Sequence, residues 1–178
     1  MKKILQLAGF CAVLLASAQG AMAAEDRALA ITVYPTIIDG CYTQVEAEAE
    51  QAIRIHSELM VIGLNCQHMT PAGQKNLYQS YREFTSRHSD LFARYERTML
   101  GYYARTKSTN PEAKLNTMRT EFANKIALDS ARMRPDLFCG HYMPRIQRVS
   151  TMQKTDIQKW AATFFPGHPP SQPICGQK

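Results

Sequence analysis

Two Cys-x-His triplets, at residues 66–68 and 139–141, are the part of this sequence best suited to chemistry. Two cysteine thiolates and two imidazoles form a ligand set that tetrahedral zinc accepts. Each triplet also has a methionine nearby, and imidazole combined with thioether suits copper, especially Cu(I). The residues of this copper hypothesis are His68, Met69, His141 and Met143.

Cysteine usage favours disulfides over thiolate ligands. Residues 1–23 have two lysines, an apolar run and a small-residue site ending at Ala23, which is typical of a cleaved secretory signal peptide. Of the five cysteines, Cys11 would leave with that segment, and four would remain in an exported chain. An even number of cysteines in an oxidising compartment predicts two disulfides, with three possible connectivities. The two lysines at the start of this predicted signal and its short apolar run are typical of bacterial signal peptides, which indicates the periplasm or the extracellular space.

Helical periodicity organises the rest of the chain, because apolar residues recur every three to four positions in five segments. These predicted helices are 41–65, 71–105, 111–132, 135–149 and 155–165. The second would be roughly 50 Å long if straight, so a bend is expected near 86–89. Asp39 is the expected cap of the first helix, and Thr155 is the expected cap of the last.

The predicted fold is all-α. Segment 24–40 has no sustained period and is interpreted as an N-terminal arm, and the helical bundle domain covers 41–165. The tail 166–178 has four prolines, which predicts irregular backbone held in place by Cys175. Short connections favour antiparallel neighbours, so we expect an up-down bundle of four main helices plus a short C-terminal helix.

Helix geometry selects one pairing of the cysteines. Cys41 and Cys66 stand at opposite ends of the first predicted helix, 25 residues or ~37 Å apart, whereas a disulfide needs Cα atoms within ~7 Å. In an up-down bundle, Cys66 and Cys139 lie at one pole, while Cys41 and Cys175 lie at the other. The sequence therefore predicts the disulfides Cys66–Cys139 and Cys41–Cys175.

Charge is distributed unevenly along the chain. Residues 24–69 carry two basic and seven acidic side chains, and residues 70–178 carry seventeen basic and eight acidic ones. Guanidinium groups bind carboxylate and phosphate, so an arginine-rich end predicts an acidic protein or an anionic envelope surface as partner. The arginines around the turn between the third and fourth predicted helices are Arg132, Arg134, Arg145 and Arg148. An equal alternative is that the acidic first helix pairs internally with the basic helices.

Known catalytic signatures are missing from the sequence. It has no Gly-x-Ser-x-Gly elbow, no His-Glu-x-x-His pair and no phosphate-binding glycine loop. Neither Cys-x-x-Cys-His nor Glu-x-x-His occurs, so no haem, di-iron centre or other cofactor is predicted. Glu46, Glu48 and Glu50 alternate around a helix and are interpreted as a solvated first turn. Glu58 lies two residues from His56, so these two side chains are expected to diverge.

These features together predict an exported, non-catalytic helical protein that binds another exported or envelope protein, in the manner of an inhibitor or immunity protein. The alternatives are a periplasmic copper or zinc protein and an enzyme whose helical active site carries no known motif. Nucleic acid is disfavoured as a partner by export and by the mixed signs of charge. After residue 23 no apolar stretch approaches the ~20 residues that a membrane span needs.

Overall fold

The structure is a computed structural model that describes residues 40–70 and 72–176. The described residues form the expected all-α bundle, and an isolated parallel bridge joins Tyr42 to Ile174. The elements are α1 (Gln44–Cys66), η1 (Gln67–Met69), α2 (Leu77–Arg87), α3 (Ser89–Arg105), α4 (Pro111–Arg132), α5 (Pro135–Val149) and α6 (Lys154–Ala161). The predicted signal peptide, almost all of the predicted arm and Pro71 lie outside the described residues. Among the described helices, none is both long and apolar enough to cross a membrane.

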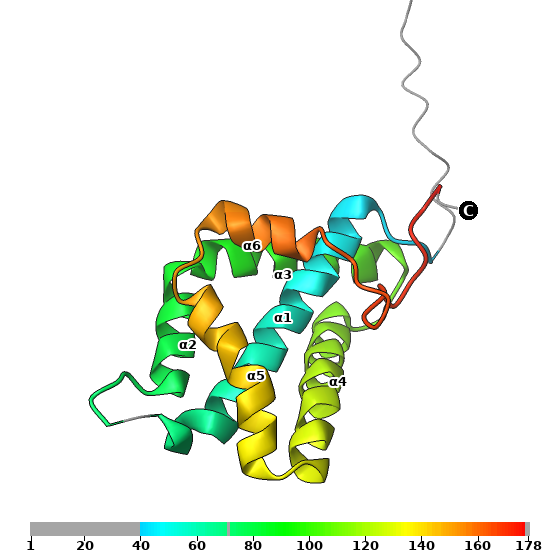
Figure 1. Cartoon of the computed structure of the whole chain (residues 1–178). Coiled ribbons are helices and arrows are strands. Elements are labelled where there is room, and N and C mark those ends of the chain that lie inside the picture. The colour runs from blue at the N-terminus through cyan, green and yellow to red at the C-terminus, as the bar shows by residue number, and fades with distance from the viewer. Residues whose placement is uncertain (1–39, 71, 177–178) are drawn as a thin grey trace, which may run out of the picture. The chain divides into compact units, whose positions relative to one another are not determined.

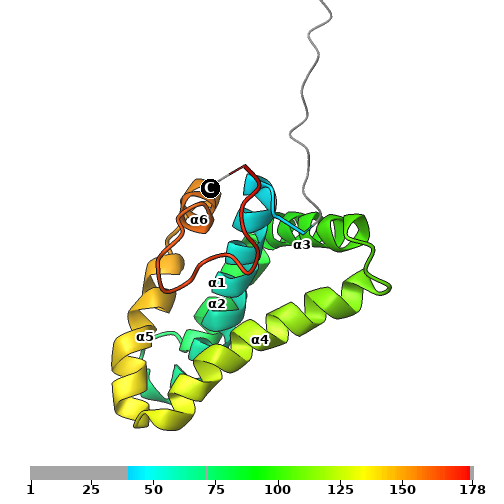
Figure 2. The ribbon, with the colours of Figure 1, turned by 90° about the vertical axis from the view of Figure 1, so that its right-hand side faces the viewer.

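The central helix of the bundle is α1. Each of the helices α2 to α6 packs against it, and Figures 1 and 2 show them arranged around it. Ile53 and Ile55 lie about 200° apart around the helix axis, yet both are buried. A helix buried on opposite faces belongs to the interior of a fold. Several polar side chains of α1, among them Glu46, Glu50 and Arg54, are enclosed along with apolar ones.

The predicted helix 71–105 is two helices, α2 and α3, separated at His88. The break falls within the bend expected at 86–89. At His88 the backbone leaves helical geometry, with φ −114° and ψ 20°, and the buried imidazole Nε2 lies 3.2 Å from the carbonyl oxygen of Met152. The expected start at residue 71 is wrong, because Asn76 caps α2 by accepting hydrogen bonds from Tyr78 N and Gln79 N.

Two other helix caps differ from the sequence prediction. Thr43, rather than Asp39, caps α1, and its backbone N–H donates to the Glu46 carboxylate at 2.7 Å in return. Gln153, rather than Thr155, caps α6. At Thr43 the side chain and Glu46 satisfy two backbone N–H groups reciprocally, and at Gln153 the backbone N–H donates to the Asp156 carboxylate at 3.0 Å. The predicted bounds of α4 and α5 are confirmed.

Both predicted disulfides are present. Cys66–Cys139 joins the end of α1 to α5, with Cα atoms 5.5 Å apart. Cys41–Cys175 joins the residues before α1 to the C-terminal tail, with Cα atoms 5.2 Å apart. Beside it, Tyr42 N donates to Pro173 O at 2.9 Å. The tail is thereby held along the first half of α1.

Candidate functional site

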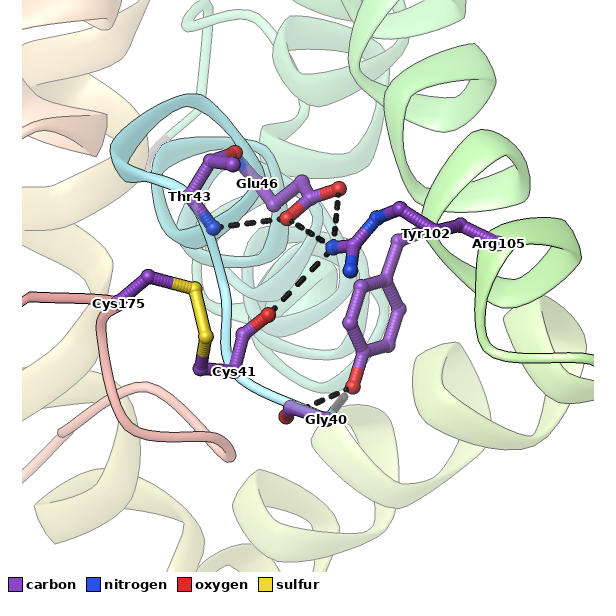
Figure 3. The surroundings of a disulfide bond; sticks show 7 residues. All are labelled: Gly40, Cys41, Thr43, Glu46, Tyr102, Arg105 and Cys175. Carbon is purple, nitrogen blue, oxygen red and sulfur yellow. Dashed lines mark hydrogen bonds and ion pairs between the residues drawn. A yellow bond between two sulfur atoms is a disulfide. The ribbon is translucent and has the colours of Figure 1, made fainter. Parts of the chain in front are cut away.

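The prediction of a solvated acidic first turn on α1 is wrong for two of its three glutamates, and only Glu48 is partly exposed. Glu46 and Glu50 are buried. Arg105 of α3 donates to the Glu46 carboxylate at 2.8 Å and to the carbonyl oxygen of Cys41, next to the disulfide with Cys175 (Figure 3). Part of the charge asymmetry of the sequence is thus neutralised internally, as the alternative hypothesis expected.

The buried pair Glu50–Arg54 connects α1 to the tail. The Glu50 carboxylate accepts hydrogen bonds from Ser171 N at 2.9 Å and from Arg54 at 3.0 Å. The same nitrogen of Arg54 donates to the carbonyl oxygen of Pro169 at 2.9 Å. The Arg54 guanidinium lies 4.4 Å from the centroid of the Phe122 ring. Only 6% of Arg54 is exposed, and in the described residues its Nε–H has no hydrogen-bond acceptor.

A cavity of about 270 Å³ opens beside this pair, between α1, α5, α6 and the tail. We call it the arginine cleft and define it by Arg54, Glu58, Arg145, Arg148, Trp160 and His168, all of which line it. A smaller cavity of about 170 Å³ adjoins it, shares three of these residues and adds Lys125, Asp129 and Tyr142. The cleft therefore combines three guanidinium groups, one carboxylate and one imidazole with the indole of Trp160.

Glu58 is the carboxylate of the arginine cleft. It is 7% exposed, and Arg145 of α5 donates to its Oε2 at 3.1 Å. Burial raises the pKa of Glu58, and this effect outweighs the opposing attraction of Arg145, Arg54 and Lys125. A carboxyl group in this setting gives up its negative charge more readily than one in water.

His168 approaches Glu58 from the tail. Its Nδ1 lies 3.8 Å from Glu58 Oε1, which is too far for a hydrogen bond and is an ion pair only when the imidazole is protonated. Burial and the nearby cations Lys125, Arg54 and Arg145 lower the pKa of His168. The imidazole is therefore neutral near pH 7, and its buried Nδ1 has no hydrogen-bond partner in the described residues.

The Arg145 guanidinium is held in place by its neighbours on α4 and α5. It lies 4.9 Å from the centroid of the Tyr142 ring, within cation–π range. The Tyr142 hydroxyl donates to Asp129 at 2.8 Å, and burial together with this acceptor raises the pKa of Tyr142 to about 12. Arg148 lies three residues further along α5, on the same side of the helix, and is exposed. No acidic side chain among the described residues pairs with it.

The four predicted anion-binding arginines do not form one site. Arg145 and Arg148 line the arginine cleft. Arg132 is exposed at the end of α4, and Arg134 pairs with Asp136 at 2.9 Å in solvent. At about 1.5 Å per residue, Arg145 lies roughly 15 Å along α5 from that turn. The four arginines therefore lie in two separate pairs, and anion binding by either pair stays a prediction.

The structure also separates the predicted metal ligands. Cys66 and Cys139 are joined to each other, so the zinc hypothesis, which needs their thiolates, is wrong. His141 and Met143 are two residues apart on α5 and project about 200° apart around its axis. His141 is exposed, whereas Met143 packs against the core. His68 and Met69 are exposed on η1. In the part of the chain that the structure describes, no three His, Cys, Asp or Glu side chains gather as a metal site would require.

Sequence reasoning missed four residues of the arginine cleft: Arg54, Glu58, Trp160 and His168. A signal for two of them was present, since Glu46, Glu50, Arg54 and Glu58 recur every four residues and so form one charged ridge along α1. No family model, curated protein or solved structure matches this chain. The geometry of the cleft is therefore the basis for inferring a function.

Proposed function

We propose that this protein is an exported, non-catalytic binding protein whose arginine cleft receives an acidic side chain of another exported or envelope protein. The observation that carries the proposal is Arg54, a buried cation that lines the cleft and whose Nε–H finds no acceptor among the residues that the structure describes. A buried donor left unpaired costs about 1–3 kcal/mol. A carboxylate entering the cleft would offer the missing acceptor.

The charge balance of the cleft supports an anionic ligand. Arg54, Arg145 and Arg148 are permanent cations, and Glu58 supplies the one carboxylate among the residues that define the cleft. A second negative charge would still leave the lining cationic. Guanidinium groups bind carboxylates through paired, charge-assisted hydrogen bonds, so this lining suits an aspartate or glutamate side chain.

The aromatic residues on one side of the cleft support a protein partner. Trp160 is half-buried, and Phe165 lines the same cavity while 47% exposed. Aromatic and arginine side chains contribute most of the binding energy in many protein interfaces. The preferred acidic side chain would therefore have an apolar neighbour, which could pack on these rings.

The proposed export is consistent with the two disulfides, which brace the arginine cleft. Disulfides persist in oxidising compartments such as the periplasm. Cys41–Cys175 holds the tail that carries His168, and Cys66–Cys139 holds α5, which carries Arg145 and Arg148. A cleft braced in this way keeps its shape before a partner arrives, which reduces the ordering cost of binding.

A direct test uses the single tryptophan of the chain, which lies in the cleft. The oxidised protein is titrated with the capped dipeptide N-acetyl-Phe-Glu-amide while Trp160 fluorescence is followed. The matched ligand N-acetyl-Phe-Gln-amide removes only the charge. We expect the glutamate peptide to bind at least about tenfold more tightly, since a hydrogen bond to a charged group contributes about 1.5–3 kcal/mol. Equal affinities for the two peptides would refute recognition of an acidic group.

Two variants test whether the glutamate peptide binds in the arginine cleft. Arg148→Gln removes an exposed cation of the cleft, and Arg134→Gln removes an exposed cation from the α4–α5 turn. We expect the first to weaken binding of the glutamate peptide about tenfold and the second to leave it unchanged. The same pair of variants, used as baits in envelope extract, tests the partner: a protein captured equally by both would bind somewhere other than the cleft.

A further inference from the structure

Glu58 is a carboxylate inside a cleft whose three arginines would attract an anionic ligand. Its Oε2 accepts from Arg145 at 3.1 Å, so a lining that suits anions already contains one. An entering carboxylate would meet both the attraction of Arg145 and the repulsion of Glu58. At about 5 Å, two like charges in a partly buried site oppose each other enough to change an affinity about tenfold.

We propose that Glu58 is a built-in counter-ion that occupies, in the free protein, the place on Arg145 that a ligand carboxylate takes, so that the cleft binds acidic ligands more tightly once Glu58 is neutral. This inference rests on the proposed function and names how the same site is regulated. The ligand group is a carboxylate, because it replaces a carboxylate on the same guanidinium and matches its charge and shape.

Charged or titratable groups surround Glu58 from α1, α4, α5 and the tail, whereas α6 contributes the uncharged Trp160 to the cleft. Arg54 lies on α1 itself, Lys125 and Asp129 lie on α4, Arg145 and Tyr142 lie on α5, and His168 lies on the tail. Asp129 accepts the hydrogen bond of Tyr142, whose raised pKa keeps that hydroxyl neutral. The cations remain charged through the physiological range. Glu58 and His168 are therefore the groups that change the net charge of the cleft on mild acidification.

Both changes act in the same direction. Glu58 has a raised pKa, so as the pH falls it takes up a proton before an ordinary glutamate does and the cleft loses a negative charge. His168 has a lowered pKa, so it gains its positive charge only at a more acidic pH than an ordinary histidine. A glutamate side chain on the ligand, with an ordinary pKa of about 4.3, keeps its charge down to about pH 5.5. Acidification to that pH therefore strengthens attraction to the ligand.

The test compares wild-type protein with Glu58→Gln, which keeps the shape of the side chain and an oxygen for Arg145 but carries no charge. N-acetyl-Phe-Glu-amide is titrated at pH 7.5 and at pH 5.5, with Trp160 fluorescence as the readout. We expect Glu58→Gln to bind about tenfold more tightly than wild type at pH 7.5. We also expect the wild-type affinity to rise on acidification and the variant affinity to change less.

Three outcomes separate the possibilities. If Glu58→Gln binds equally or more weakly at pH 7.5 while the wild type still prefers the glutamate peptide to the glutamine peptide, the counter-ion role is wrong and the proposed function stands. If the wild type shows no such preference at either pH, both are wrong. If Glu58→Gln does not fold, the wild-type titration decides, because an affinity that stays constant between pH 7.5 and pH 5.5 overturns the inference.

Discussion

His56 of α1 should make the protein sensitive to acid in a way that one substitution removes. Its Nε2 lies 3.0 Å from the Tyr81 hydroxyl and 3.2 Å from the Thr85 hydroxyl. Because one lone pair faces two hydroxyl groups, we assign the proton of the neutral ring to Nδ1. The ring packs against Phe92, with centroids 4.6 Å apart. Protonation would place a positive charge among these groups.

The size of the effect follows from the pKa of His56. Burial, with a further contribution from Arg119, lowers this pKa from 6.5 to about 4. Below pH 6.5 the unfolded chain binds a proton on His56, whereas the folded chain stays neutral at this side chain until about pH 4. The contribution of neutral His56 to the free energy of unfolding is therefore fully present above pH 6.5 and is lost as the pH falls. At about 1.36 kcal/mol per unit of pKa, the folded state loses about 3 kcal/mol between pH 7 and pH 4 through this side chain.

Urea unfolding of the oxidised protein at pH 7 and at pH 4 measures this loss. His56→Gln keeps a neutral acceptor for the two hydroxyls, so the variant should lose about 3 kcal/mol less than wild type between the two pH values. His68→Gln, which changes an exposed imidazole on η1, controls for the removal of a histidine as such and should keep the wild-type dependence. If His56→Gln loses as much stability in acid as wild type, the burial argument is refuted.

Two further predictions concern the tail and the buried pair beneath it. Replacing both Cys41 and Cys175 by serine should lower the free energy of unfolding by up to about 4–5 kcal/mol, because the disulfide closes a loop with a sequence separation of 134. Urea unfolding measures the change. A loss below about 1 kcal/mol would contradict this prediction. Arg54→Met should cost about 3–5 kcal/mol in the same assay, since it leaves the Glu50 carboxylate buried without its cation. The double variant Glu50→Gln/Arg54→Met should then be more stable than Arg54→Met alone, and the reverse order would show that the ion pair is not the cause.

Several features of the fold follow from short stretches of sequence. Asn110 accepts a hydrogen bond from Ala113 N and Pro111 occupies the first turn of α4, so this start depends on four consecutive residues. The cysteine pairing could be predicted because the length of a helix is also a local property. A rigid α1 keeps Cys41 and Cys66 apart whatever surrounds it.

The break between α2 and α3 was only partly predictable. Apolar spacing runs through His88 without interruption, so the pattern indicated one long helix with a bend. What accompanies the break in the structure is a contact between His88 and the carbonyl oxygen of Met152, 64 residues away. Periodicity reports which face of a helix is apolar, and it carries no information about a distant hydrogen-bond partner.

The candidate site likewise combines features that are local in the sequence with contacts between distant segments. By itself the sequence determined the all-α class, the bounds of α4 and α5, the disulfides and the four-residue spacing of the charged ridge on α1, because each depends on neighbouring residues or on helix length. Tertiary structure alone decided that this ridge is buried, since its cover comes from Ser171 and Pro169, 121 and 115 residues beyond Glu50 and Arg54 respectively. It also brought Arg145 to Glu58 across 87 residues. A charged side chain on a helix meets solvent or a counter-charge according to what folds over it, and that depends on the whole chain.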